Sequence, residues 1–302
     1  MKACRRMNKV FVTGDLHGDA IARFSYSKNP PLRETIQEGD IVVCLGDCGI
    51  VDWPGFEKQC DYTLDWLNDK PQTTILLYGN HDNYDAIQKY PVIKKYGGYV
   101  RQVRDNVFAV DFPTVLNLND NKCLLIPGAD SHDIWNLFYS WQKDEIRRCR
   151  TNGKWYRVVG QSWWPQEKVN EPACSTLLGI YSRYVNDYDS DKRKFDYVLT
   201  HDCPDFMFKI WYSGDRRVPT EGEEFLGYLA TCLSYKGWWH GHCHEELFAY
   251  GDEDFKTNHR QPTKPHNIAC IYHNIYEIDS LYNLNKINLS ENIPSLSKKD
   301  MV

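Results

Sequence analysis

Five short polar motifs carry most of the side chains in this sequence that could do chemistry. The first three each begin with glycine, namely Gly14-Asp15-Leu16-His17, Gly46-Asp47 and Gly79-Asn80-His81-Asp82. The other two are rich in histidine, namely Thr200-His201-Asp202 and His240-Gly241-His242-Cys243-His244. Six of the 10 histidines lie in these motifs, whereas random placement would scatter them along the chain.

The motifs offer carboxylate, amide and imidazole groups, and none of them needs a thiolate. This mixture suits Mn²⁺, Fe or Zn²⁺ better than Ca²⁺ or an iron–sulfur cluster. Two such ions about 3.5–4 Å apart, bridged by one carboxylate and one hydroxide, form the arrangement used for in-line displacement at phosphorus. The motifs therefore indicate hydrolysis of a phosphate ester with two divalent or trivalent metal ions as cofactors, manganese being the first choice.

Short apolar runs alternate with longer amphipathic ones in the first half of the sequence, as in α/β proteins. Strands are predicted at residues 9–13, 41–45 and 74–78, and each is followed directly by one of the glycine motifs. Helices are predicted at residues 20–26 and 55–68, the second opened by Pro54. His242 and His244 alternate along a segment that we expect to be extended, so both imidazoles should face one site.

The rest of the chain predicts more strands and one inserted segment. A strand meander is expected at 107–110, 115–118 and 122–126, with Asn119-Asp120-Asn121 as a hairpin turn. Strands are also expected at 195–200, 236–239, 268–272 and 275–278, with a helix at 223–234. Residues 1–280 should form one domain that carries a cap-like, partly helical insertion at about 131–194, and residues 281–302 a loosely held tail.

Composition limits the class of protein and its compartment. The formal charge of −5 gives no support to a protein that coats nucleic acid, although nucleic acid stays open as a substrate. The 11 cysteines are odd in number and contain no Cys-x-x-Cys pair, which predicts neither a disulfide framework nor a thiolate zinc site. No run approaches the roughly 18 apolar residues of a membrane span. We therefore expect a cytoplasmic protein without a membrane partner.

The ordered set Asp-x-His, Gly-Asp, Gly-Asn-His-Asp, His and Gly-His-x-His resembles the calcineurin-like metallophosphoesterases, and the resemblance spans 14–244. It implies a four-layer αββα sandwich, in which two β-sheets lie face to face with helices outside. The implied ligands are Asp15, His17 and His244 for one metal, Asn80, His201 and His242 for the other, and Asp47 as the bridge. His81 would donate a proton toward the leaving oxygen or fix the phosphate, while a metal-bridging hydroxide attacks phosphorus.

Two departures separate this chain from the protein phosphatase branch of that family. The branch follows its bridging aspartate with Asp-Arg-Gly, whereas here Asp47 is followed by Cys48-Gly49-Ile50, and Asp82 stands where those phosphatases carry Glu. The sequence resembles bacterial and phage-type members of the family more than the protein phosphatases. The substrate is a phosphomonoester or a phosphodiester. The alternatives are a serine/threonine-type protein phosphatase, a nucleic-acid phosphodiesterase, and a noncatalytic scaffold, which the complete ligand set disfavours.

The insertion is expected to fold over the metal site and to select the substrate. Trp163 and Trp164 could stack on a base or cover the metals, the alternative being that the pair anchors the insertion to the sandwich. Arg157 and three further arginines could donate charge-assisted hydrogen bonds to phosphate oxygens; the three are Arg147, Arg148 and Arg150. Residues 128–133 either border the substrate pocket, as the resemblance implies, or form a turn and a helix N-cap.

Four residues inside the motifs have a simple structural explanation. Cys48, Cys203 and Cys243 are expected to be small buried residues beside the ligands. His240 either touches the site or has a structural role at the end of its strand.

Overall fold

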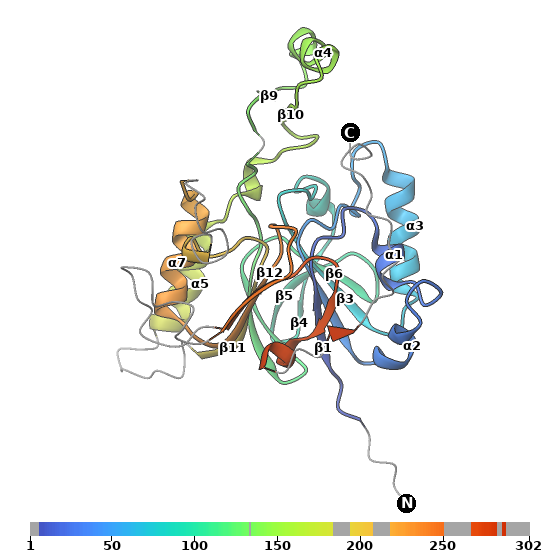
Figure 1. Cartoon of the computed structure of the whole chain (residues 1–302), viewed down its shortest axis with the longest axis vertical. Helices are drawn as coiled ribbons and strands as arrows, with labels where there is room; N and C mark the ends of the chain where they lie inside the picture. The colour runs from blue at the N-terminus through green and yellow to red at the C-terminus, as the bar shows by residue number, and fades with distance from the viewer. Residues whose placement is uncertain are drawn as a thin grey trace, which may run out of the picture.

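The computed structural model describes residues 6–132, 134–183, 194–207, 218–250, 267–282 and 286–287. Two large β-sheets lie face to face, and helices cover their outer faces (Figure 1). The first sheet contains, in spatial order, β16 (Lys286–Ile287), β15 (Ile275–Glu277), β1 (Val10–Thr13), β2 (Ile41–Leu45), β3 (Thr73–Leu77), β6 (Val107–Val110), β5 (Gly98–Gln102) and β4 (Val92–Lys95). The second contains β13 (Leu247–Tyr250), β14 (Asn267–Cys270), β12 (Ser234–His240), β11 (Lys194–Thr200), β8 (Asn121–Ile126) and β7 (Thr114–Leu118).

Helices α1 (Ala20–Phe24), α2 (Pro31–Thr35) and α3 (Glu57–Asn68) lie beside the first sheet, and α5 (Glu171–Arg183) and α7 (Glu221–Cys232) beside the second (Figure 1). The four layers follow from strands that are apolar on both faces. In β2, Val42 contributes to the core under α3, while the next residue, Val43, contributes to the core between the sheets. A third core packs α5 and α7 against β8, β11 and β12. The predicted αββα sandwich is confirmed.

The strands that carry the motifs run parallel to one another. β1, β2, β3 and β6 are parallel neighbours in the first sheet, and β8, β11, β12 and β14 in the second. Carboxyl ends of parallel strands meet at the same edge of a sheet, so the loops after β1, β2 and β3 lie together, as do those after β11 and β12. The sequence pattern predicted the bounds of the five strands that precede the motifs, β1, β2, β3, β11 and β12, to within two residues at either end.

Two local predictions were wrong, and one hairpin was missed. The expected meander does not exist, because β6 belongs to the first sheet while β7 and β8 pair in the second, the chain crossing between the sheets at residues 111–113. The turn within the β7–β8 hairpin is as predicted, with Asn119 and Asp120 both at positive φ. Helix α3 begins at Glu57, so Pro54 lies outside it. The pattern also missed the β4–β5 hairpin, which turns at Tyr96 and Gly97 with positive φ.

The segment between β8 and β11 divides into two parts. Residues 137–158, hereafter the arm, comprise β9 (Leu137–Phe138), α4 (Lys143–Thr151) and β10 (Arg157–Val158), and project away from the two sheets (Figure 1). The short helix η2 (Pro165–Glu167) and α5 return to the body. Within the described residues, no helix has both the length and the apolar character needed to span a bilayer.

Candidate metal centre

Four predicted ligands converge from the loops after β1, β2 and β12. Asp15, His17, Asp47 and His244 each offer a ligand atom within 4.8 Å of the others. The Nε2 atoms of His17 and His244 are 2.9 Å apart, and His244 Nε2 lies 3.0 Å from Asp15 Oδ2. Side chains from three separate loops thus point their donor atoms at one place.

A second group lies directly beside the first and shares one member with it. Asp47, His201 and His242 also offer ligand atoms within 4.8 Å of one another. His201 Nε2 lies 3.1 Å from Asp47 Oδ1 and 3.1 Å from Asn80 Oδ1, so Asn80 joins this group. Asp47 is therefore the one carboxylate common to both groups, and all seven predicted ligands are brought together.

The loops reach this geometry through strained backbone. His17, Asp47, His242 and His244 all have positive φ, between 45° and 67°, a region that residues other than glycine seldom occupy outside functional turns. His242 and His244 therefore lie on a turn and not on the extended segment that their alternation predicted. Glycine is required at position 79, because an added Cβ there would lie 2.3 Å from Asp47 Oδ1.

Asp82 holds two of the loops together. Its carboxylate accepts hydrogen bonds from the backbone N–H groups of Gly79, Cys48 and Gly49, at 2.8, 3.2 and 2.8 Å. Burial and the charge of Asp47 raise the pKa of Asp82 to about 6. The sequence placed Asp82 in a motif but gave it no role, and the structure makes it the brace that fixes the loop of Asp47 against that of Asn80.

The carboxylates and imidazoles of the two groups shift one another's pKa values. Burial disfavours the charged form of Asp47, but His201, His81 and His17 hold the pKa of Asp47 well below its usual range. Burial alone would lower the pKa of His201, yet Asp47 raises it to about 10. His242 behaves in the opposite way, since burial and the nearby His201 lower its pKa to about 3. The carboxylates thus favour positive charge at their centre.

The donor set fits metal cations. Among the described residues, His242 Nε2 is a buried atom that has no hydrogen-bond partner. Buried acceptors without a donor are costly unless a cation satisfies them. Carboxylate, amide and imidazole are ligands that Mn²⁺, Fe and Zn²⁺ accept. His201 Nδ1–H donates to Leu45 O at 2.7 Å, which orients Nε2 toward the centre, as is common for metal-binding histidines.

His81 and Arg157 form a pair beside the two groups. The backbone N–H of His81 donates to Asp47 Oδ1 at 2.7 Å, and its ring lies 5.5 Å from that of His17. Arg157 Nη2 lies 2.8 Å from His81 Nε2 and Nη1 lies 3.3 Å from Nδ1. A neutral imidazole has one acceptor nitrogen, so only one of these contacts is a hydrogen bond donated by Arg157. Arg157 Nη1 also donates to Ser162 O at 3.0 Å.

The base of the arm and its flanking residues border the site, while α4 projects away from the body (Figure 1). Asn80 Nδ2 donates to Ser131 Oγ at 3.1 Å, and the rings of His132 and His242 lie 5.2 Å apart. Residues 131 and 132 of the 128–133 cluster thus lie beside the metal centre, whereas residue 133 lies outside the described residues. The polar residues of this cluster were visible in the sequence, but the same residues are also typical of a turn with a helix N-cap.

The two tryptophans differ in their surroundings. Trp164 is 1% exposed, donates from Nε1 to Asp85 Oδ2 at 3.1 Å and contacts Trp53 edge to face. Such a ring anchors the inserted segment and is not open to a substrate in this structure. Trp163 is half-buried and pairs with Val159.

Two charged residues, one buried and one partly buried, were missed because no motif contains them. Arg23 on α1 donates to the carbonyl oxygens of Tyr272, at 2.7 Å, and Asp15, at 3.1 Å. Glu246 accepts backbone N–H groups from residues 272–274 and the hydroxyl of Tyr276. Both fix loops that border Asp15. The sequence of a helix or loop does not indicate whether a charged residue such as Arg23 or Glu246 points toward the interior.

The burial of the Glu167 carboxyl predicts that the free energy of unfolding depends on pH. Its buried carboxyl accepts the N–H of Ser131 at 3.2 Å, and burial raises its pKa to about 8. Between pH about 4.5 and 8 the unfolded chain therefore loses a proton that the folded protein keeps, so stability falls by up to ~1.4 kcal/mol per pH unit. Glu167→Gln removes this effect. The melting temperature of the variant minus that of the wild type should rise from pH 5 to pH 8, and a constant difference would contradict the buried neutral carboxyl.

The sequence profile of the family described as calcineurin-like phosphoesterase matches residues 8–246. Comparison with curated protein sequences gives no significant match. Among solved structures, the phosphopantetheinyl hydrolase PptH from Mycobacterium tuberculosis is similar at 12% identity and a TM-score of 0.36, covering 88% of this chain and 90% of that chain. The profile match covers most of the chain and all five motifs, and this protein therefore belongs to the calcineurin-like phosphoesterase family of metal-dependent phosphate-ester hydrolases.

Proposed function

We propose that this protein hydrolyses a phosphomonoester or phosphodiester at a dinuclear metal centre. Asp15, His17 and His244 would hold one ion, Asn80, His201 and His242 would hold the other, and Asp47 would be the ligand shared by both. The observation that carries the proposal is that, among the described residues, Asp47 is the one carboxylate that belongs to both groups of ligand atoms. When bound, two such ions lower the pKa of water and neutralise charge on phosphoryl oxygens. Manganese is the first choice, and iron and zinc also suit these ligands.

The chain itself contributes groups that act on the phosphate and on the leaving oxygen. Arg157 is 7% exposed and its guanidinium is held by Ser162 O, so it is oriented before a substrate arrives. A phosphate that enters beside the centre can accept from Arg157 in place of the His81 ring. His81, fixed through its backbone to Asp47, then faces the leaving oxygen and donates a proton to it.

The described cysteines support an intracellular, reducing compartment. All ten cysteines of the described residues are free thiols, and most of them are buried. Free thiols persist where glutathione keeps them reduced. We therefore propose a cytoplasmic location, which fractionation of cells that express the tagged protein would test.

Removal and return of metal tests the proposed activity. The purified protein is stripped with a chelator, its metal content is measured, and hydrolysis is followed with p-nitrophenyl phosphate, bis-p-nitrophenyl phosphate, cyclic nucleotides, a phosphopeptide and short oligonucleotides. We expect no hydrolysis by the stripped protein and recovery when Mn²⁺ is added. Full activity of a protein that contains no metal would contradict the proposal. The ratio of monoester to diester rates assigns the substrate class.

Replacement of Arg157 tests its role in phosphate binding. A hydrogen bond to a charged group contributes about 1.5–3 kcal/mol, so Arg157→Ala should lower kcat/KM by about tenfold to a hundredfold, mainly through KM. Arg150→Ala is the matched control, because Arg150 is exposed on α4 and donates to Tyr156 Oη. Arg157→Lys should recover part of the loss. Equal effects of the Arg157 and Arg150 variants would contradict the assignment.

A further inference from the structure

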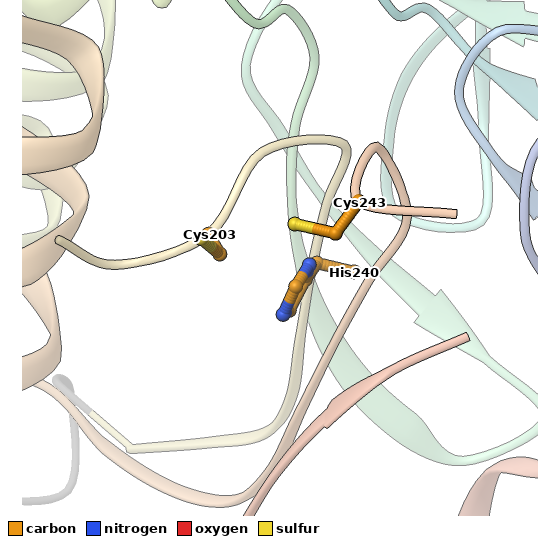
Figure 2. Close-up of side chains that lie close together, drawn as sticks. All are labelled: Cys203, His240 and Cys243. Carbon is orange, nitrogen blue, oxygen red and sulfur yellow. The ribbon is translucent and has the colours of Figure 1, made fainter. Parts of the chain in front are cut away.

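A second cluster of metal-binding side chains lies behind the candidate dinuclear centre. It consists of Cys203 on the loop after β11 together with His240 and Cys243 at the end of β12 and on the loop that follows (Figure 2). The same two loops deliver His201 and His242 to the dinuclear centre. Neighbouring residues on each loop thus belong to two different clusters, His201 and His242 to the dinuclear centre and Cys203 and Cys243 to the second cluster.

The geometry of this thiol cluster suits a single ion. The sulfurs of Cys203 and Cys243 and a ring nitrogen of His240 all lie within 4.8 Å of one another. Two thiolates bound tetrahedrally to one Zn²⁺ at about 2.3 Å have sulfurs about 3.8 Å apart, so shifts of about 1 Å or less would bring the three groups to one ion. Cys203 and His240 are buried, while Cys243 is partly exposed and provides a route of entry.

A fourth group at the cluster points to a cation. Asp202 is fully buried, and among the described residues its Oδ2 atom has no hydrogen-bond partner. The carboxylate lies within 4.8 Å of Cys203 Sγ. The same carboxyl also lies within 4.8 Å of a Glu223 oxygen. A buried carboxyl oxygen without a hydrogen-bond partner is costly, so a cation bound at Cys203, the residue that both groups share, would be favoured by Asp202. Three protein ligands with a carboxylate nearby form a common zinc environment.

We propose that Cys203, His240 and Cys243 bind one soft divalent cation, with Zn²⁺ the best match, as a third metal site distinct from the dinuclear centre. The thiolates select a soft ion, whereas the dinuclear centre contains no sulfur. A bound ion would join the loop after β11 to the loop after β12. It would thereby fix the backbone from which His201 and His242 extend, whatever reaction the neighbouring centre catalyses.

Cobalt provides a direct test on the full-length wild-type protein. Co²⁺ replaces Zn²⁺ in such sites, and a thiolate bound to Co²⁺ gives a charge-transfer band in the near ultraviolet, which ligands of oxygen and nitrogen do not give. We expect this band in cobalt-loaded wild type and in Asp47→Asn, and its loss in the double variant Cys203→Ser/Cys243→Ser. Cys123→Ser is the matched control, because Cys123 is equally buried but lies near the start of β8.

Metal counting gives an independent result. After loading with Zn²⁺ and gel filtration, elemental analysis should find three ions per chain in wild type, two in the double cysteine variant and one in Asp47→Asn. Absence of the thiolate band in folded, cobalt-loaded wild type overturns the third site, and so does a band that persists in the double variant. Neither outcome depends on hydrolysis, so failure of the third site and failure of the proposed activity are distinguishable.

Discussion

Asp47→Asn should abolish hydrolysis and remove both ions of the candidate dinuclear centre. An amide supplies no negative charge between two cations, and the carboxylate of Asp47 is the one shared by both groups of ligands. Two-metal sites contribute several kcal/mol to stabilisation of the transition state, so the rate should fall by about 10³-fold or more. Elemental analysis and hydrolysis of p-nitrophenyl phosphate measure the two effects.

The substitution is nearly isosteric, so the fold should survive it. The amide oxygen of the new asparagine can still accept the hydrogen bond from the N–H of His81. What the variant loses is the negative charge of the Asp47 carboxylate. Asp130→Asn is the matched control, because Asp130 lies near the rim of the site and pairs with Lys168 at 3.7 Å. Wild-type metal content with full activity in Asp47→Asn would show that Asp47 is not the bridge.

The sequence predicted the parallel strands and the residues that follow them, since both signals are local. A buried strand of a parallel sheet is a continuous apolar run, and β2 matches its prediction at both ends. Sequence does not specify which sheet a strand joins, because the apolar pattern of β6, β7 or β8 reports burial of the strand and not the identity of its neighbours. The meander was wrong for this reason, and the crossing at residues 111–113 depends on packing between the sheets.

The thiol cluster could not be predicted from the sequence for a related reason. Zinc sites are found in sequence from short spacings such as Cys-x-x-Cys, which this chain lacks. Cys203 and Cys243 are separated by 40 positions, and only the parallel pairing of β11 with β12 brings their loops together. The burial of Trp164 could not be predicted either, since the Trp163-Trp164 pair in the sequence does not indicate that one ring is buried against Trp53.

His81→Asn should lower kcat without removing the metals. The His81 ring lies at 5.5 Å from that of His17 and contacts Arg157, whereas its backbone, not its ring, bonds to Asp47. A positioned general acid contributes about 10²–10⁴-fold to a rate. The loss should be largest for a poor leaving group such as phenolate and small for p-nitrophenolate, which departs without a proton.

The comparison of the two leaving groups separates protonation from phosphate binding. If His81 only helps Arg157 to bind phosphate, both substrates lose rate equally and KM rises for both, as expected for Arg157→Ala. If its imidazole is the proton donor, phenyl phosphate loses kcat by at least tenfold more than p-nitrophenyl phosphate, and Arg157→Ala shows no such difference. Metal analysis completes the test, because loss of an ion from His81→Asn would make His81 a ligand and exclude both roles.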